Sequence, residues 1–307
     1  MLDKAGAVPR AAWIEIPSGV WPVTDLKLRK IPFEFSGVKF IWNPENPGFS
    51  FFMNQVSFWA IGLERYFCRA VADAERLITD PAALAEARGF RIQEAQHSLR
   101  HTHHVRALIE RHPGLQQALD ATIDCYDDIY DRHDLKFHLG YAAALEATFT
   151  PVFRTIIEHR DVLFGNGDPR VSSLFLWHFC EEIEHRSSAL IIFNALYGDS
   201  FYRMRMFRHV RRHVMQNFET MAALFTAHVD EGPAVRPVRN PLAAVPLRDR
   251  LKLQAGLLAS QMPWHNPEHE RLPVWADSWF DSYERGEDMT RFYRGPDPAG
   301  QALPTNA

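Results

Sequence analysis

Apolar side chains recur every three or four residues along most of the region 52–229, which is the spacing of one face of an α-helix. Proline and glycine positions divide this pattern into five long segments, with a break expected near His133 inside the third. These segments span residues 52–78, 82–112, 115–163, 169–197 and 200–229. The pattern predicts an all-α bundle, and a sixth, shorter helix is expected over residues 248–261.

The two ends of the chain lack this helical pattern. Residues 1–50 are rich in proline, glycine and tryptophan, and their short apolar runs at 13–16 and 38–42 suit strands or extended chain. We expect this segment to form an arm that wraps over the bundle of residues 51–230. Residues 231–307 begin with a proline-rich linker, continue through the short helix and end in an irregular tail rich in aromatic residues.

Four glutamates occupy positions where the helical pattern calls for apolar residues. They are Glu64, Glu94, Glu146 and Glu182, one on each of the first four segments. A carboxylate on an apolar face is costly unless it is paired or binds a metal ion. A neutral or paired core glutamate would explain one such position. However, His97 and His185 follow Glu94 and Glu182 by three residues, which places each histidine on the same helix face as its glutamate.

The order of these residues along the chain is Glu, Glu-x-x-His, Glu, Glu-x-x-His, divided between two helical hairpins. This is the ligand set of four-helix bundles that hold two iron or two manganese ions. Two divalent ions a few ångströms apart repel each other, and carboxylates both offset that repulsion and bridge the ions. We therefore predict a ferritin-like four-helix bundle that holds two iron ions, with manganese or zinc as alternatives.

Two further histidines lie on the same helix faces. His178 lies four residues before Glu182, and His101 lies four residues after His97. His178 is either a third nitrogen ligand or a hydrogen-bond donor to a ligating carboxylate, whereas the second role is favoured for His101. Glu181 and Glu184 flank the last motif and are interpreted as solvated carboxylates or as partners behind the ligands.

Composition and charge bear on three properties: nucleic-acid binding, membrane insertion and location in the cell. The chain of 307 residues has a formal net charge of −4, which does not favour a nucleic-acid partner. The chain has no apolar run of the length that a membrane span requires, about 18 residues, and its N-terminal residues have no apolar stretch of signal-peptide length, so we expect neither a membrane span nor a signal peptide. The three cysteines form no CxxC pair, which is typical of a reducing compartment and predicts a cytoplasmic location.

Several stretches resemble a known bacterial family, the predicted metal-dependent hydrolases, which are grouped with ferritin-like proteins. They are GLERYF (62–67), FRIQEAQHSLRH (90–101), LGYAAALEATFTP (139–151) and LWHFCEEIEHRSSAL (176–190), and the resemblance spans about residues 35–230. It implies metal binding more firmly than hydrolysis. The stripe of His178, Glu182 and His185 is also similar to the last ligand helix of di-iron arylamine N-oxygenases, which implies a ligand role for His178.

Three functions fit this set of residues. The first is a di-iron oxygenase or oxidase acting on a small, largely apolar substrate, which needs an external electron donor because no flavin, haem or iron–sulfur motif is visible. The second is a hydrolase in which a metal-bridged water attacks the substrate, with Glu181 or Glu184 as a candidate base. The third is an iron-handling protein without enzymatic activity. A homodimer is a candidate assembly for each.

Overall fold

The computed structural model describes residues 26–296, and these residues form helices, turns and loops with no strand. The candidate strand at 38–42 is instead a bent segment of the arm, and the one at 13–16 lies outside the described residues. The prediction of an all-α fold is therefore confirmed for the part of the chain that the structure covers. Within that part, no helix is both long and apolar enough to cross a membrane.

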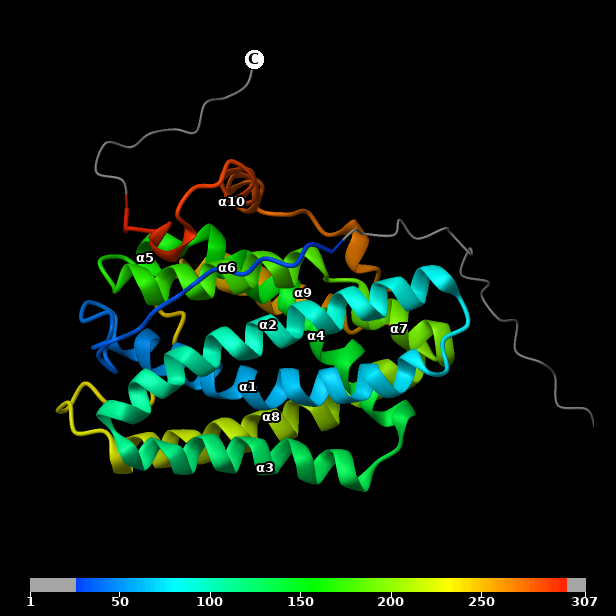
Figure 1. Cartoon of the computed structure of the whole chain (residues 1–307), viewed down its shortest axis with the longest axis horizontal. Helices are drawn as coiled ribbons and strands as arrows, with labels where there is room; N and C mark the ends of the chain where they lie inside the picture. The colour runs from blue at the N-terminus through cyan, green and yellow to red at the C-terminus, as the bar shows by residue number, and fades with distance from the viewer. Residues whose placement is uncertain (1–25, 297–307) are drawn as a thin grey trace, which may run out of the picture.

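Seven helices make up the bundle and its immediate surroundings (Figure 1). They are α1 (Pro47–Glu75), α2 (Pro81–Arg111), α3 (Gln116–Arg132), α4 (Leu135–Glu158), α6 (Pro169–Glu184), α7 (Ser188–Leu196) and α8 (Ser200–His228). Helices α1 and α2 form the most extensive pair, and α4 packs against both α6 and α8. Apolar side chains from all these elements join in one continuous core.

Aspartate and asparagine caps begin the four helices that carry the predicted ligands. Asn46, Asp80, Asp134 and Asp168 each accept a hydrogen bond from a backbone N–H of the first turn. Proline follows the cap in α1, α2 and α6, where its missing N–H costs nothing. The cap at Asn46 explains why α1 starts earlier than residue 52, the start that the apolar pattern indicated.

Further differences between the predicted and the observed helices follow along the chain. The break near His133 is confirmed, but the helix after it ends at Glu158 and is followed by the short α5 (Arg160–Leu163). The prediction of one helix over residues 169–197 is wrong, because the chain turns between α6 and α7. The tail is also less irregular than expected, since it contains α10 (Val274–Glu284) and two short 3₁₀ helices, η2 (Pro267–His269) and η3 (Met289–Arg291).

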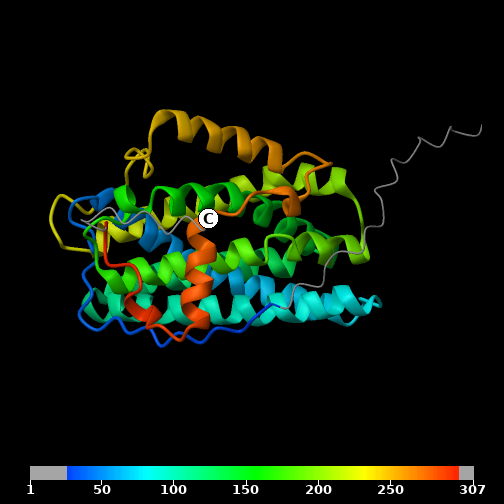
Figure 2. The same ribbon diagram turned by 90° about the horizontal axis from the view of Figure 1, so that it is seen from above.

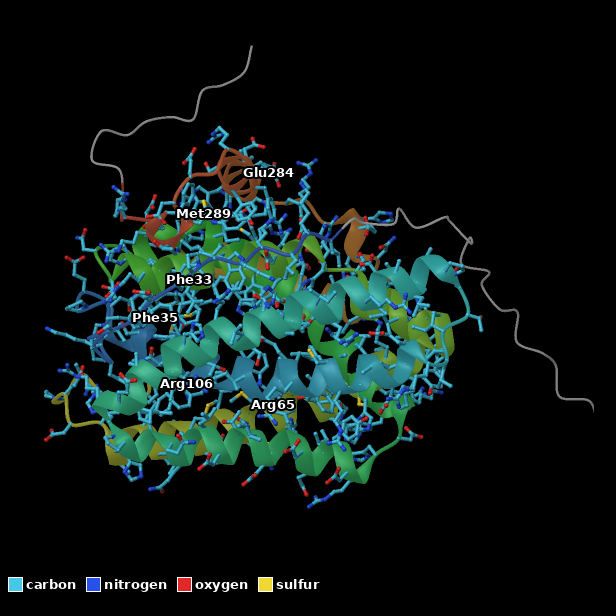
Figure 3. The ribbon with its side chains drawn as sticks, viewed as in Figure 1. Phe33, Phe35, Arg65, Arg106, Glu284 and Met289 are labelled. Carbon is cyan, nitrogen blue, oxygen red and sulfur yellow. The ribbon has the colours of Figure 1, made fainter. Side chains whose placement is uncertain are left out.

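Both ends of the described chain pack on the same side of the bundle. The arm runs between α2 and the C-terminal elements, so Phe33 and Phe35 lie on the side of Glu284 and Met289 (Figure 3). The Phe33 ring contacts Trp177 of α6, and the Phe35 ring contacts His104 of α2. Helix α9 (Leu247–Ser260) instead packs on α4, at the outer edge of the molecule (Figure 2). The arm and α10 therefore cover the helices that carry the Glu-x-x-His motifs.

Candidate metal centre

Four helices of the bundle bring seven buried side chains into one cluster. They are Glu64 from α1, Glu94 and His97 from α2, Glu146 from α4, His178 and Glu182 from α6, and His185 from the turn after α6. Candidate ligand atoms fall into two groups, and within each group they lie within 4.8 Å of one another. Glu182 belongs to both groups, so the two candidate ion positions are adjacent.

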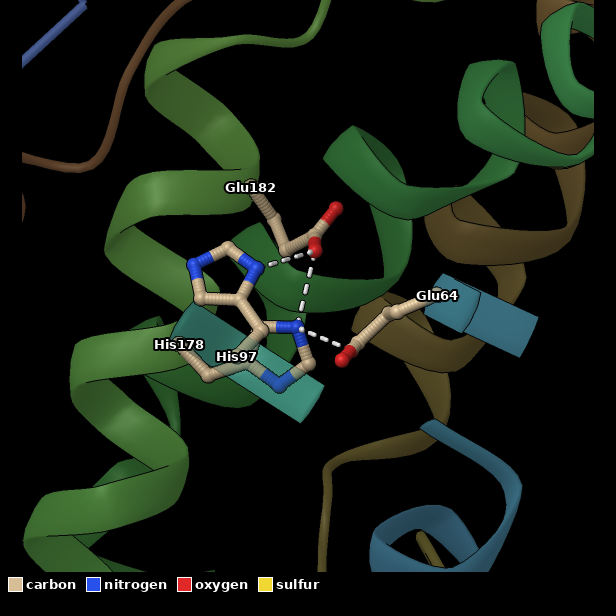
Figure 4. Close-up of side chains that lie close together, drawn as sticks. All are labelled: Glu64, His97, His178 and Glu182. Atoms are coloured by element: carbon tan, nitrogen blue, oxygen red, sulfur yellow. Dashed lines mark hydrogen bonds and ion pairs between the residues drawn. The ribbon is translucent and has the colours of Figure 1, made fainter. Parts of the chain in front are cut away.

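The first group contains two histidines and two glutamates (Figure 4). His178 Nε2 lies 2.8 Å from Glu182 Oε1 and 3.3 Å from Glu64 Oε1. His97 Nδ1 lies 3.3 Å from the same Glu182 oxygen. Two nitrogen and two oxygen atoms thus face a common point, which is the arrangement that a bound cation requires.

The second group contains one histidine and three glutamates. His185 Nε2 lies 3.2 Å from Glu182 Oε2 and 3.3 Å from Glu94 Oε1. Glu146 Oε2 completes the group at 3.9 Å from the same nitrogen. Because Glu182 presents Oε1 to the first group and Oε2 to the second, its carboxylate is placed to bridge two ions.

The turn after α6 does not disturb the second motif. His185 is the C-cap of α6, and its backbone N–H still bonds to the carbonyl of Glu181, at 3.0 Å. The helical hydrogen-bond pattern therefore extends to His185, which keeps its side chain on the face of Glu182. This local reason explains why the spacing rule finds the histidine although the helix ends there.

Several atoms of the cluster are buried without a hydrogen-bond partner. They are Glu64 Oε2, Glu94 Oε1, both carboxylate oxygens of Glu146, and His97 Nδ1. A buried polar atom left without a partner costs about 1–3 kcal/mol, and more when it is charged. All five atoms can donate a lone pair, so a cation bound between them would satisfy all of them. The side chains therefore fit a metal pair.

Without a bound cation, the buried carboxylates of the cluster repel one another. Burial, together with the neighbouring carboxylates, raises the pKa of Glu64 and Glu146 well above the usual range and that of Glu94 to about 8. Burial also opposes ionisation of Glu182, but His185, His178 and His97 outweigh it and hold its pKa well below the usual value. Carboxyl groups with a raised pKa retain their protons, and metal binding would displace those protons, as it does wherever carboxylates are ligands.

Each histidine of the cluster has a hydrogen bond that points away from the candidate ions. His97 Nε2 lies 2.9 Å from Glu181 Oε2, and His185 Nδ1 lies 2.9 Å from Gln93 Oε1. His178 Nδ1 lies 2.8 Å from His101 Nε2. Such partners fix the ring tautomer and orient the other nitrogen toward the metal. His101 thus contacts a histidine of the cluster, not the carboxylate that sequence reasoning assigned to it.

Glu181 and Glu184 lie behind the cluster and outside both candidate ligand groups. Glu181 is fully buried between His97 and Arg29, and the half-buried Glu184 contacts Gln93 and Arg29. Of the two roles that the sequence left open for Glu181, burial excludes the solvated one. Gln93 and Arg29 were missed, because an amide beside a ligand and an arginine in an irregular arm carry no periodic signal.

The chain matches the family described as predicted metal-dependent hydrolase over residues 27–270. It belongs to that family. The resemblance noted from the sequence is therefore confirmed, and it extends beyond the bundle into the arm and the C-terminal region. No curated protein and no solved structure is significantly similar to the chain.

This member of the family of predicted metal-dependent hydrolases has a small cavity beside the cluster. The cavity measures about 10 Å³, which is roughly the room that one water molecule needs. Glu64, Glu94, His178 and Glu182 form its polar side. The remaining lining is apolar and consists of Val56, Trp59, Ala60, Leu63, Phe149 and Phe153. The candidate metal centre thus borders a space suited to a small, weakly polar molecule.

Proposed function

We propose that the chain binds two metal ions through the seven clustered side chains. Glu64, His97 and His178 would hold one ion. Glu94, Glu146 and His185 would hold the other, and Glu182 would bridge the two. The unsatisfied lone pairs inside the cluster support this assignment, because they leave a cation as the partner with the right charge. The order of ligands is also that of ferritin-like di-metal bundles, which supports the same architecture here.

We further propose that the two ions are iron and that the activity is an O2-dependent oxidation of a small, largely apolar substrate. The observation that carries this proposal is the apolar cavity of about 10 Å³ against Glu64 and His178. A diatomic gas matches such a cavity, whereas an ester, a peptide or the organic substrate of the oxidation would need the helices to open. Bound ferrous ions would supply the electrons for O2 reduction, and an external donor would restore them.

The protein's own residues have defined tasks in this proposal. Glu182 would contribute to both ion positions, and Glu64, Glu94 and Glu146 would supply further negative charge to offset that of the two ions. Phe149, Phe153 and Trp59 exclude bulk water from the cavity, which strengthens every electrostatic interaction within it. Glu181 and Gln93 hold His97 and His185 in fixed orientations.

Metal-dependent hydrolysis is the second candidate, and the family's description favours it. A metal ion lowers the pKa of bound water to about 7 and so creates a nucleophile. The two carboxylates that sequence reasoning offered as a base are already engaged, however. Glu181 pairs with Arg29 and His97, and Glu184 pairs with Arg29 and Gln93. A hydrolytic mechanism would therefore depend on the acidity of the metal-bound water itself, or on a glutamate of the cluster as the base.

Metal analysis combined with an oxygen electrode separates these functions. We expect about two iron ions per chain after expression in iron-replete medium, and O2 consumption that requires a reductant. Ester or phosphoester turnover with zinc or manganese, independent of O2, would replace the oxidase proposal with the hydrolase. Two bound ions with neither activity would indicate an iron-handling protein. A folded chain without metal would refute the metal centre itself.

A further inference from the structure

Arg29 of the N-terminal arm is a buried cation that contacts two carboxylates of α6. Only 3% of its side chain is exposed. Its Nη1 donates to Glu181 Oε1 at 3.0 Å and to Glu184 Oε2 at 2.8 Å, and its Nη2 donates to Glu184 Oε1 at 2.8 Å. The pair with Glu184 is therefore bidentate, which is the strongest and most directional form of such a contact. One guanidinium thus fixes two neighbouring carboxylates.

Each of these carboxylates leads to a different histidine of the metal centre. Glu181 uses its second oxygen to contact His97 Nε2 at 2.9 Å. Glu184 Oε2 accepts a hydrogen bond from Gln93 Nε2 at 2.7 Å, and Gln93 Oε1 contacts His185 Nδ1 at 2.9 Å. Two hydrogen-bonded paths therefore run from Arg29, one to each of the two candidate ions.

Helix α10 holds the guanidinium from its other side. The Arg29 Cζ atom lies 4.7 Å from the centre of the Phe280 ring and 5.6 Å from that of Tyr283. Such cation–π contacts stabilise a buried arginine. The carbonyl of Lys27 also accepts a hydrogen bond from Gln93 Nε2, at 3.0 Å. The arm, α10 and the outer hydrogen bonds of the metal centre therefore form one connected unit.

We propose that Arg29 is a positioning residue for both metal ions, and that docking of the arm and α10 is coupled to metal binding. This inference rests on the proposed metal centre. Without Arg29, the buried Glu181 would face His97 with no fixed cation behind it, and the His97 ring would lose its orientation. Because coupling between two binding events is reciprocal, a bound metal pair must also stabilise the docked arm.

The first test compares metal affinity in Arg29→Met, Arg29→Lys and the control Lys30→Met. Lys30 follows Arg29 on the same arm, and its side chain is exposed. Changes in residues that orient metal ligands typically cost 10–100-fold in affinity. We expect about that loss in Arg29→Met, a smaller loss in Arg29→Lys, which cannot form the bidentate pair, and none in the control.

Mössbauer spectra of the iron-loaded variants report on each ion separately. Arg29→Met should alter the signals of both ions, whereas Gln93→Leu, which leaves the Arg29 pairs intact, should alter only the ion of His185. Native affinity and unchanged spectra in Arg29→Met would overturn the inference. If that variant fails to fold, changes at both ions in Gln93→Leu would overturn the assignment of separate paths. A wild-type protein that binds no metal would instead refute the proposed metal centre.

Hydrogen exchange of the wild-type chain, with and without Zn²⁺, tests the coupling directly. We expect Zn²⁺ to slow amide exchange in residues 26–46 and in α10. Helix α9 packs on α4, on the other side of the molecule from the arm (Figure 2), and serves as the internal control. Equal exchange of the arm in the metal-free and metal-bound proteins, at full Zn²⁺ occupancy, would show that docking and metal binding are independent.

Discussion

The two halves of the candidate metal centre differ in their balance of nitrogen and oxygen. The half with His97 and His178 has two imidazoles and two carboxylates, whereas the half with His185 has one imidazole and three carboxylates. The imidazole-rich half satisfies part of its own hydrogen bonding, since His178 contacts both Glu182 and His101, although Glu64 Oε2 and His97 Nδ1 have no partner. In the carboxylate-rich half, Glu146 has no hydrogen-bond partner at either oxygen.

This difference shows that the two halves depend on a cation to unequal degrees. Three carboxylates around one position repel one another when ionised, and burial strengthens that repulsion. A cation therefore relieves more unfavourable charge in the half of Glu94 and Glu146 than in the half of His97 and His178. We expect the first equivalent of metal to enter the carboxylate-rich half and the second to complete the imidazole-rich half.

Glu182→Ala should have the largest effect, because it removes the one ligand that both halves share. We expect metal content to fall from about two ions per chain to near zero, with helix content largely retained, since the change also relieves carboxylate repulsion in the metal-free bundle. Metal analysis and circular dichroism give the two readouts. Glu75→Ala, at the C-terminal end of α1, is the control. Full metal occupancy in Glu182→Ala would show that Glu182 is not a ligand.

Glu146→Gln separates the halves. The amide keeps the shape of the side chain but carries no negative charge, so only the carboxylate-rich half should lose its ion. We expect about one ion per chain, bound by the group that contains His178, as measured by metal analysis and spectroscopy of the remaining ion. Loss of both ions would mean that the halves assemble only together, and two ions would mean that Glu146 is not a ligand.

His178→Gln probes the imidazole-rich half with a milder change. The variant keeps a polar group but loses the ring nitrogen that faces Glu64 and Glu182. We expect spectra of the oxidised iron protein to change at one ion only, with weaker binding of that ion. Unchanged spectra with a modest loss of activity would assign His178 to hydrogen bonding behind the ligands, and would weaken the similarity to N-oxygenases.

The pH dependence of the metal-free protein should show the smallest effect. Burial raises the pKa of Glu94 from 4.5 to about 8, so the folded chain retains a proton that the unfolded chain has already lost. Stability must then fall as the pH rises toward about 8, by about 1 kcal/mol between about pH 7 and about pH 8 from this group alone.

Denaturant unfolding at about pH 7 and about pH 9 measures this loss, with the metal-loaded protein as the control. This pH range avoids acid. Burial lowers the pKa of His101 and His178, so their protonation at acid pH would destabilise the fold as the pH falls, which is the opposite pH dependence. Metal-free protein that is more stable at the higher pH would contradict the raised pKa of the buried glutamates.

The sequence alone was sufficient to predict most of the helices of the bundle and to select the seven side chains that the fold brings together. Both rest on local regularities, since the helical repeat places His97 on the face of Glu94 and His178 on the face of Glu182 wherever the helix packs. Family membership followed from the same motifs and is confirmed by the match over residues 27–270. Helix ends were less predictable, because Asn46 and the turn at His185 depend on single hydrogen bonds that periodicity does not reveal.

Only the tertiary structure decided how the seven clustered side chains divide into two halves and which hydrogen bonds orient them. Segments that are distant along the chain meet in each of the contacts that decide this. The two carboxylate oxygens of Glu182 face different groups, His178 contacts His101, and Arg29 contacts Glu181. Helix α10 was missed for the same reason, since its short apolar face has meaning only against the arm and α6. Contacts between distant segments depend on packing in three dimensions, which leaves no repeat in the sequence.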